Sequence, residues 1–260
     1  MKPRAIWLIG KSVLIESVRR REIYAIVLIS CIIIGTVMTL DFFGLEGLTK
    51  FYRETALTIM STATALTVIV LSARQLPREF TNRTIYPLLA KPVSRLTFLF
   101  GKLLGVMLAA AFCFALFMAV YVAGSIWLHG AIPWTLFAQY IWLQLLSMLI
   151  LATLAFWLSM VLNLDAAITL AVIFYITAAT FTSITTYIYS LVGPAQRAIL
   201  LILNYALPQL TLFDLSEKTV HDEIWPPLSL GVMSALTLYG CLFAAIYFSL
   251  AMLSFRRRPL

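Results

Sequence analysis

The chain has 260 residues, of which 62% are hydrophobic and 12% are charged, whereas about 25% are charged in a typical soluble domain. This composition excludes an ordinary soluble protein. The net charge of +8 does not indicate nucleic acid, because the lysines and arginines are concentrated in three blocks beside apolar segments, the pattern of a membrane protein's cytoplasmic face.

The first segment, residues 3–22, mixes apolar and basic side chains and predicts an amphipathic helix at the membrane interface. Trp7 is expected at the depth of the lipid headgroups. Glu16 precedes Arg19 and Arg20 by about one helical turn, so these side chains are expected to pair on one helix face. A soluble tail without fixed structure is the alternative for this segment.

Apolar runs along the rest of the chain predict membrane-spanning helices, since one crossing needs roughly 20 apolar residues. Residues 103–164 contain no Asp, Glu, Lys or Arg, and a break is expected at residues 129–134, which include a glycine and a proline. The whole chain is therefore predicted to be a single all-α polytopic membrane domain, residues 1–260. Its six predicted spans are residues 23–40, 55–73, 103–127, 136–162, 166–191 and 228–255.

The apolar residues 198–213 offer an alternative, seventh crossing. Pro208 interrupts this run, and the stretch on either side of the proline is too short to span. Six spans also place both termini and residues 74–102 on one side, together with most of the 19 lysines and arginines. We therefore expect both termini in the cytoplasm and residues 192–227 outside, as a re-entrant or loop segment.

The middle of every predicted span lacks Asp, Glu, Lys, Arg and His. Ion-coupled carriers usually need such residues as relays or binding groups, so coupling to an ion gradient is not expected. Hydroxyl side chains on the second and fifth spans are candidates for lining a pathway. These candidates are Thr58, Thr62, Thr177 and Thr180. The alternative is that they only form hydrogen bonds between helices.

The chain carries no pattern typical of catalytic or metal-binding residues. His129 and His221 fall in separate predicted loops, and neither HExxH nor GxSxG occurs. Residues 10–12 resemble the end of a phosphate-binding loop, but Ala5 stands where its first glycine should be. The three cysteines lie inside apolar runs, without metal-ligand spacing. We expect no catalysis, metal or cofactor in this chain.

Residues 74–102 form a polar, basic and proline-containing segment between the second and third predicted spans. Pro77 is expected to end the helix of the second span, and a short helix, interrupted near Pro87, is expected at residues 79–89. Ser94 is placed to cap a helix that begins at Arg95. A plain loop that only sets the membrane topology is the alternative for this segment.

The residue pattern of this segment is more specific than its charge. Gly101 and Gly105 form a small-xxx-small pair, which allows close approach of another helix. Five short motifs follow one another: Arg78-Glu79-Phe80, Arg83-Thr84-Ile85, Leu88-Leu89, Lys91-Pro92-Val93-Ser94-Arg95 and Gly101-Lys102. This order resembles the membrane subunits of type-2 ABC exporters (the ABC-2 family). The N-terminal helix, which ends in Glu16 and Arg19 to Arg21, is similar to the elbow helix of that family.

In that family the segment is the first cytoplasmic loop and forms the coupling helix that docks on the ATPase. The resemblance implies a non-catalytic permease subunit in a bacterial inner membrane, acting as a homodimer with two copies of a cytoplasmic ABC ATPase. ATP and Mg²⁺ would be bound by that partner and not by this chain. The coupling residues that the resemblance implies are Glu79, Arg83, Thr84, Lys91, Pro92 and Arg95.

Export of an amphiphilic or lipid-like substrate is the function that the resemblance implies, along a two-fold interface of spans one, two and five. Small permeases of the copper-site maturation type are similar in size and in the basic carboxyl end, and residues 204–215 resemble an external segment of theirs. Residues 197–223 are candidates for docking an external partner, or they merely cap the bundle. Two functions remain as alternatives: a mechanical relay from the ATPase to an external maturation or envelope factor, and an ATPase-independent scaffold.

Overall fold

The computed structural model describes residues 3–19, 21–38, 44–81, 94–189, 191–221 and 223–257. These residues are predominantly helical and contain no β-strand. A helix satisfies all its backbone hydrogen bonds internally, which is what an apolar chain needs within a lipid bilayer. The helices are α1 (Pro3–Val18), α2 (Arg21–Met38), α3 (Gly44–Thr81), α5 (Arg95–Trp127), α6 (Trp134–Val161), α7 (Leu164–Ile188), α8 (Pro194–Ala206), the 3₁₀ helix η1 (Leu210–Phe213), α9 (Ser216–Val220) and α10 (Leu230–Arg257).

Four helices among the described residues are long and apolar enough to cross a membrane, which makes the chain a multi-pass membrane protein. They are Thr49–Phe80, Arg95–Trp127, Trp134–Val161 and Leu230–Arg257. Three shorter apolar helices, Tyr24–Thr36, Leu164–Ala178 and Pro194–Leu203, accompany them. The predicted count of six spans, and the position of α1 in the membrane interface, stay predictions.

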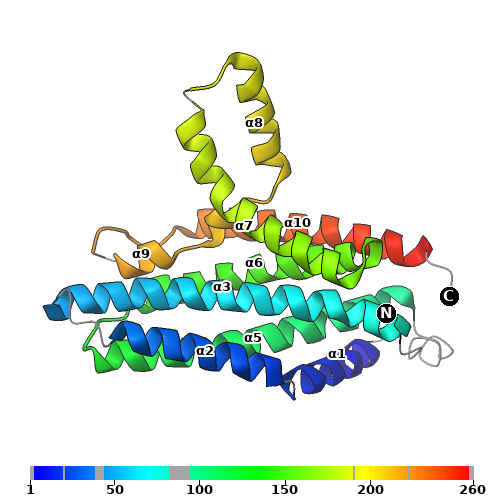
Figure 1. The fold of residues 1–260 in the computed structure, drawn as a ribbon, viewed down its shortest axis with the longest axis horizontal. Helices are drawn as coiled ribbons and strands as arrows, with labels where there is room; N and C mark the ends of the chain where they lie inside the picture. The colour runs from blue at the N-terminus through cyan, green and yellow to red at the C-terminus, as the bar shows by residue number, and fades with distance from the viewer. Residues whose placement is uncertain are drawn as a thin grey trace.

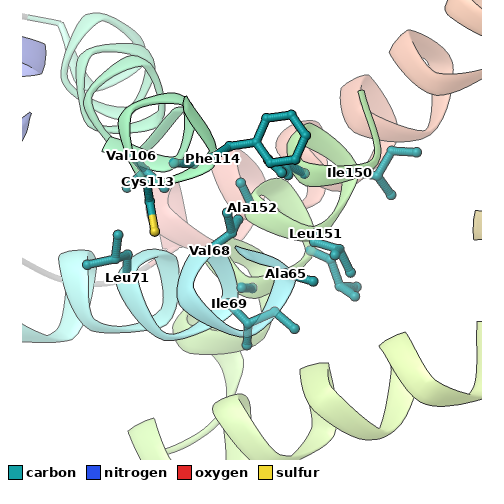
Figure 2. Packing of buried hydrophobic residues seen from close by; sticks show 14 of the residues in the cluster. Ala65, Val68, Ile69, Leu71, Val106, Cys113, Phe114, Ile150, Leu151 and Ala152 are labelled. Carbon is teal, nitrogen blue, oxygen red and sulfur yellow. The ribbon is translucent and has the colours of Figure 1, made fainter. Parts of the chain in front are cut away.

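The core of the bundle lies around α6, which packs against α10 on one side and α3 on the other, while α5 packs on α3 (Figure 1). Most side chains of α6 are buried, and the buried ones lie on every face of the helix, as expected for a helix that is apolar around its whole circumference. Figure 2 shows side chains of α3, α5 and α6 meeting in this core, with the sulfur of Cys113 directed toward α3. This core holds the long helices in register with one another.

Pro77 lies inside α3, and the prediction that it ends the helix is wrong. α3 has 38 residues and continues past the proline to Thr81. Proline costs a helix one hydrogen bond and a clash, but contacts made by the turn beyond it can outweigh that cost. Glu79 and Phe80 make such contacts, with Lys102 and Phe255 respectively. The predicted polar segment 74–102 is therefore helical at both ends, over residues 74–81 and 95–102.

The break predicted at residues 129–134 separates α5 from α6. His129 has a positive φ of 54°, a left-handed conformation that reverses the chain direction. The amide of Gly130 donates to the carbonyl of Ser125 at 2.9 Å and closes this turn. The two helices consequently return alongside each other within one short connection.

α7 and α8 form an antiparallel pair whose far end projects away from the bundle (Figure 1). α7 begins within the bundle against α6, and its later part leaves the bundle to meet α8. α8 ends at Ala206, and Leu207 before Pro208 has the extended ψ of 139° that a residue preceding proline favours. The predicted break at Pro208 is thus confirmed. The predicted external segment, residues 192–227, contains α8, η1 and α9.

Candidate functional site

The base of the bundle, where α3 ends and α5 and α10 meet, carries the polar contacts nearest to the predicted coupling segment. Ser94 begins α5: its side chain accepts a hydrogen bond from the amide of Thr97 at 3.2 Å, and its backbone is extended. An N-cap of this kind satisfies an amide that the first helical turn leaves unpaired. The helix start predicted at Arg95 is confirmed.

Lys102 is the centre of a buried polar cluster that joins α3 to α5. Its Nζ donates to Glu79 Oε1 at 2.5 Å and to Gln75 Oε1 at 3.3 Å, and it lies 5.8 Å from the ring centroid of Phe98. Gln75 and Glu79 are one turn apart, so both face α5. The side chain of Lys102 is 6% exposed and that of Glu79 is 19% exposed. We call these four residues the Lys102 clasp.

A buried ammonium group is strongly disfavoured unless a counter-charge and hydrogen-bond acceptors surround it. Glu79 supplies the counter-charge and Gln75 a neutral acceptor, which uses two of the three N–H donors of Lys102. The clasp therefore holds together only while α3 and α5 keep their relative position. It is a geometric link between the two helices that flank residues 82–93.

Arg95 links the start of α5 to the end of α10. Its Nη1 donates to the carbonyl oxygens of Phe255 and Arg256, both at 3.1 Å. These carbonyls lie in the last turn of α10, where acceptors lack helical partners and a cation complements the helix dipole. The ring of Phe255 lies 6.1 Å from those of Phe80 and Phe98 and 5.6 Å from the Arg95 guanidinium. Three helices thus converge on Phe255.

The glycine pair at the start of α5 faces α1. A Cβ atom on Gly101 would lie 2.8 Å from the Cβ of Ile9, and one on Gly105 would lie 2.5 Å from the Cβ of Val13. Gly10 on α1 approaches the same surface. These positions admit no larger residue without movement, so they set how closely α1 and α5 can pack.

The residues predicted for the elbow helix lie along and just after α1. Trp7 is 56% exposed and Arg19 is exposed, whereas Arg20 lies outside the described residues. Glu16 forms an ion pair with Arg78 of α3, a contact between two elements that sequence spacing could not indicate. α1 is therefore attached to the base through both α5 and α3.

The predicted coupling residues fall into two groups. Glu79 and Arg95 are described, and each is bonded within the chain, to Lys102 and to the end of α10 respectively. The other four, Arg83, Thr84, Lys91 and Pro92, lie outside the described residues. The two described residues bracket the other four along the sequence.

The four threonines proposed to line a pathway occupy α3 and α7. Thr58 donates to the carbonyl of Glu54 at 2.9 Å, and Thr180 donates to that of Ile176 at 2.9 Å. Both bonds are local and lie within one helix. Thr62 is half-buried on α3. Thr177 is exposed on α7.

The opposite end of α3 carries a second buried cation, Arg53. Its Nε donates to the hydroxyl of Tyr121 at 3.2 Å, and its Nη2 donates to the carbonyl of Thr219 in α9 at 2.5 Å. Arg53 is 5% exposed. Nearby, Lys50 pairs with Glu223 at 3.4 Å on the surface. α9 is thereby attached to the same long helix that ends in the clasp.

Sequence reasoning missed three functional contacts: Lys102 as the partner of Glu79, Gln75 as its second acceptor, and Arg53 as the tether of α9. The sequence did contain a signal for Lys102. This lysine directly precedes the predicted third span, which itself has no charged residue. The spacing of Gln75 and Glu79 was a second signal, because it places both on one face. Nothing in the sequence indicated that Arg53 reaches Thr219.

The described residues thus form a helical, multi-pass membrane protein in which packed helices, α3 and α5, precede and follow residues 82–93 in the sequence. Among the described residues, no group of His, Cys, Asp and Glu side chains could hold a metal ion. The family model described as ABC-2 family transporter protein matches residues 9–260, so the chain belongs to that family. It is therefore an ABC-2 type permease subunit.

This family membership defines the chain as the membrane subunit of an ABC transporter. Such subunits are in general non-catalytic and typically work with an ABC ATPase. A comparison with curated proteins found no match.

Proposed function

We propose that two copies of this chain assemble with two ABC ATPase subunits, and that residues 74–102 couple ATP hydrolysis to movement of the spans. The observation that supports this most is the construction of the base. Contacts at Glu79, Arg95 and Phe255 join α10 to α3 and α5, the two helices that flank residues 82–93 in the sequence. A force applied to that connection is thus passed to three long helices.

The coupling residues in this proposal are Glu79, Arg83, Thr84, Lys91, Pro92 and Arg95. Pro92 restricts its own φ and the backbone of the preceding residue, Lys91, and the charged residues suit electrostatic docking to a soluble partner. The ATPase supplies the nucleotide site, with its ATP and Mg²⁺. In this proposal the chain lies in a bacterial inner membrane with both termini in the cytoplasm, and α1 lies in the interface among the lipid headgroups.

Export of an amphiphilic or lipid-like substrate is the transport function that we propose. The route runs along the interface between two copies, and Thr58, Thr62, Thr177 and Thr180 are its candidate lining. Charged side chains are scarce within the spans, so the route suits a molecule with a large apolar part. The finer similarity to permeases of the copper-site maturation type stays a prediction.

A mechanical relay is a second candidate function, and one observation favours it. α3 is a single helix of 38 residues, about 57 Å long at 1.5 Å per residue. It carries the Glu79 contact near one end and the Arg53 tether of α9 near the other. Motion at the base would thus reach residues 197–223 directly, where an external maturation or envelope factor could bind.

The coupling proposal is tested by the double substitution Glu79→Ala and Arg83→Ala in the full chain, co-expressed with its ATPase. We expect the ATPase to be lost on purification while the chain still inserts in the membrane. The matched control is Lys50→Ala with Glu223→Ala, which also removes one charge of each sign, at the opposite end. Stoichiometric ATPase and full ATP hydrolysis in the Glu79 and Arg83 double variant would contradict the assignment.

A further inference from the structure

We infer that Lys102 is a positioning residue for coupling. Through Glu79 it holds the last turns of α3 against the first turns of α5, so a force applied to residues 82–93 moves both helices as one unit. This inference rests on the proposed function, in which the ATPase acts on that connection. Lys102 is 6% exposed, so it acts on the partner only through the helices that it holds.

The location of the clasp is what gives it this role. Glu79 lies close to the end of α3 at Thr81, and Lys102 lies about two turns after the start of α5 at Arg95. Without a link, a push on the connection could spread the two helix ends apart instead of moving both. The clasp opposes that spreading, because separating the helices would break the contact between Lys102 and Glu79.

The chemistry of the clasp is suited to positioning more than to stability. A buried ion pair can often be replaced by apolar residues without loss of stability, so stability alone gives no reason for a lysine there. Apolar surfaces tolerate small slips, whereas an ammonium that leaves its carboxylate is left charged and poorly solvated. The pair therefore enforces one register between α3 and α5.

A neighbouring ion pair provides the comparison. Arg78, adjacent to Glu79 in α3, pairs with Glu16 of α1, but these side chains are 52% and 42% exposed. Water can solvate both groups if they separate, so this pair imposes little restraint. The two pairs differ in burial while sharing the same helix turn, which makes Arg78→Gln a matched control.

The test uses the full chain in complex with its ATPase and measures two quantities for each variant: the amount of ATPase retained and the rate of Mg-ATP hydrolysis per retained ATPase. For Lys102→Met we expect ATPase retention near that of the unaltered chain and a hydrolysis rate about tenfold lower, within the range by which residues between two sites change their coupling. A merely structural role would lower retention and leave the rate per retained ATPase unchanged.

The conservative variant Lys102→Arg keeps a cation opposite Glu79 and leaves the coupling residue Glu79 itself unchanged. We expect it to retain at least half of the native hydrolysis rate, and Arg78→Gln to remain within twofold of the unaltered chain. A Lys102→Met rate equal to that of Arg78→Gln would overturn the inference. So would a Lys102→Arg rate no closer to the native rate than that of Lys102→Met.

Hydrogen exchange on the chain without the ATPase gives a second, independent readout, since amide exchange reports local opening. Lys102→Met should speed exchange in residues 75–81 and 95–102, and Arg78→Gln should not. Equal exchange in the two variants would show that no clasp exists. If instead the unaltered chain fails to retain any ATPase, the proposed function fails, while the exchange data still decide on the clasp.

Discussion

The two ends of the bundle are built differently. At the base, α3, α5 and α10 meet through the Lys102 clasp, the Arg95 cap and the aromatic contacts of Phe255. Between the ends, α7 and α8 project sideways from the bundle (Figure 1), with exposed apolar side chains such as Tyr187 on α7 and Leu191 in the connection between the two helices. At the end opposite the base, hydrogen bonds from Arg53 and Gln139 attach α9 and the segment before α10, beside the stacked rings of Tyr52 and Tyr121.

Because of this difference, we expect the two ends of α3 to respond differently when a helix is displaced. A densely connected base moves as one body, because displacing any helix would break buried contacts on the others. An end attached through individual hydrogen bonds can release one element at a time, since each such bond contributes little. Substitutions at the two ends should therefore differ in how far their effects spread.

The largest effect is expected for Phe255→Ala, at the base. Phe255 is 1% exposed and contacts Phe80, Phe98 and Arg95, so its truncation leaves a cavity among three helices. We expect a loss of about 3–5 kcal/mol in the free energy of unfolding, measured by denaturant titration in detergent.

Leu253→Ala is the control for that substitution, because Leu253 lies on the same helix but is 52% exposed. Similar losses for the two variants would show that the base is no more tightly packed than the surface of α10. The comparison between the two ends would then fail.

An intermediate effect is expected for Arg53→Met, at the opposite end. The substitution removes the donors to Tyr121 and to the carbonyl of Thr219, at a cost of about 1–3 kcal/mol for the acceptors left unpaired. Hydrogen exchange should accelerate in residues 216–220 and stay unchanged in residues 95–102. Lys50→Met, which alters an exposed cation on the same helix, should leave both regions as they are.

Faster exchange at the base in Arg53→Met would mean that the two ends respond together, contrary to the comparison drawn above. That outcome would in turn strengthen the relay function, because it would reveal direct communication along α3.

The smallest effect is expected for Gln139→Leu. The Gln139 amide donates to the carbonyl of Leu228 at 2.9 Å and accepts from its amide at 3.0 Å, which fixes the segment before α10. Loss of both bonds should cost about 1 kcal/mol of unfolding free energy. Gln139→Glu keeps the acceptor for the Leu228 amide, so its free energy of unfolding should lie between those of the unaltered chain and Gln139→Leu. If Gln139→Glu is as unstable as Gln139→Leu, the loss is due to packing and not to these hydrogen bonds.

Local features of the fold could be predicted from the sequence. The serine cap at Ser94, the break before Pro208 and the turn at residues 129–134 each depend on neighbours along the chain. Pro77 shows where such reasoning fails, because contacts to Lys102 and Phe255 from the residues that follow it favour a continued helix. The partner of the Gly101 and Gly105 pair, α1, was equally out of reach of local patterns.

The sequence by itself determined the class of protein, because apolar length, the position of positive charge and a short ordered motif are all properties of consecutive residues. Only the tertiary structure decided which buried charges meet: Glu79 with Lys102, and Arg53 with Thr219. The physical reason is that helices which are apolar on every face carry no mark of the face that meets a neighbour. That choice is made by how the whole bundle packs.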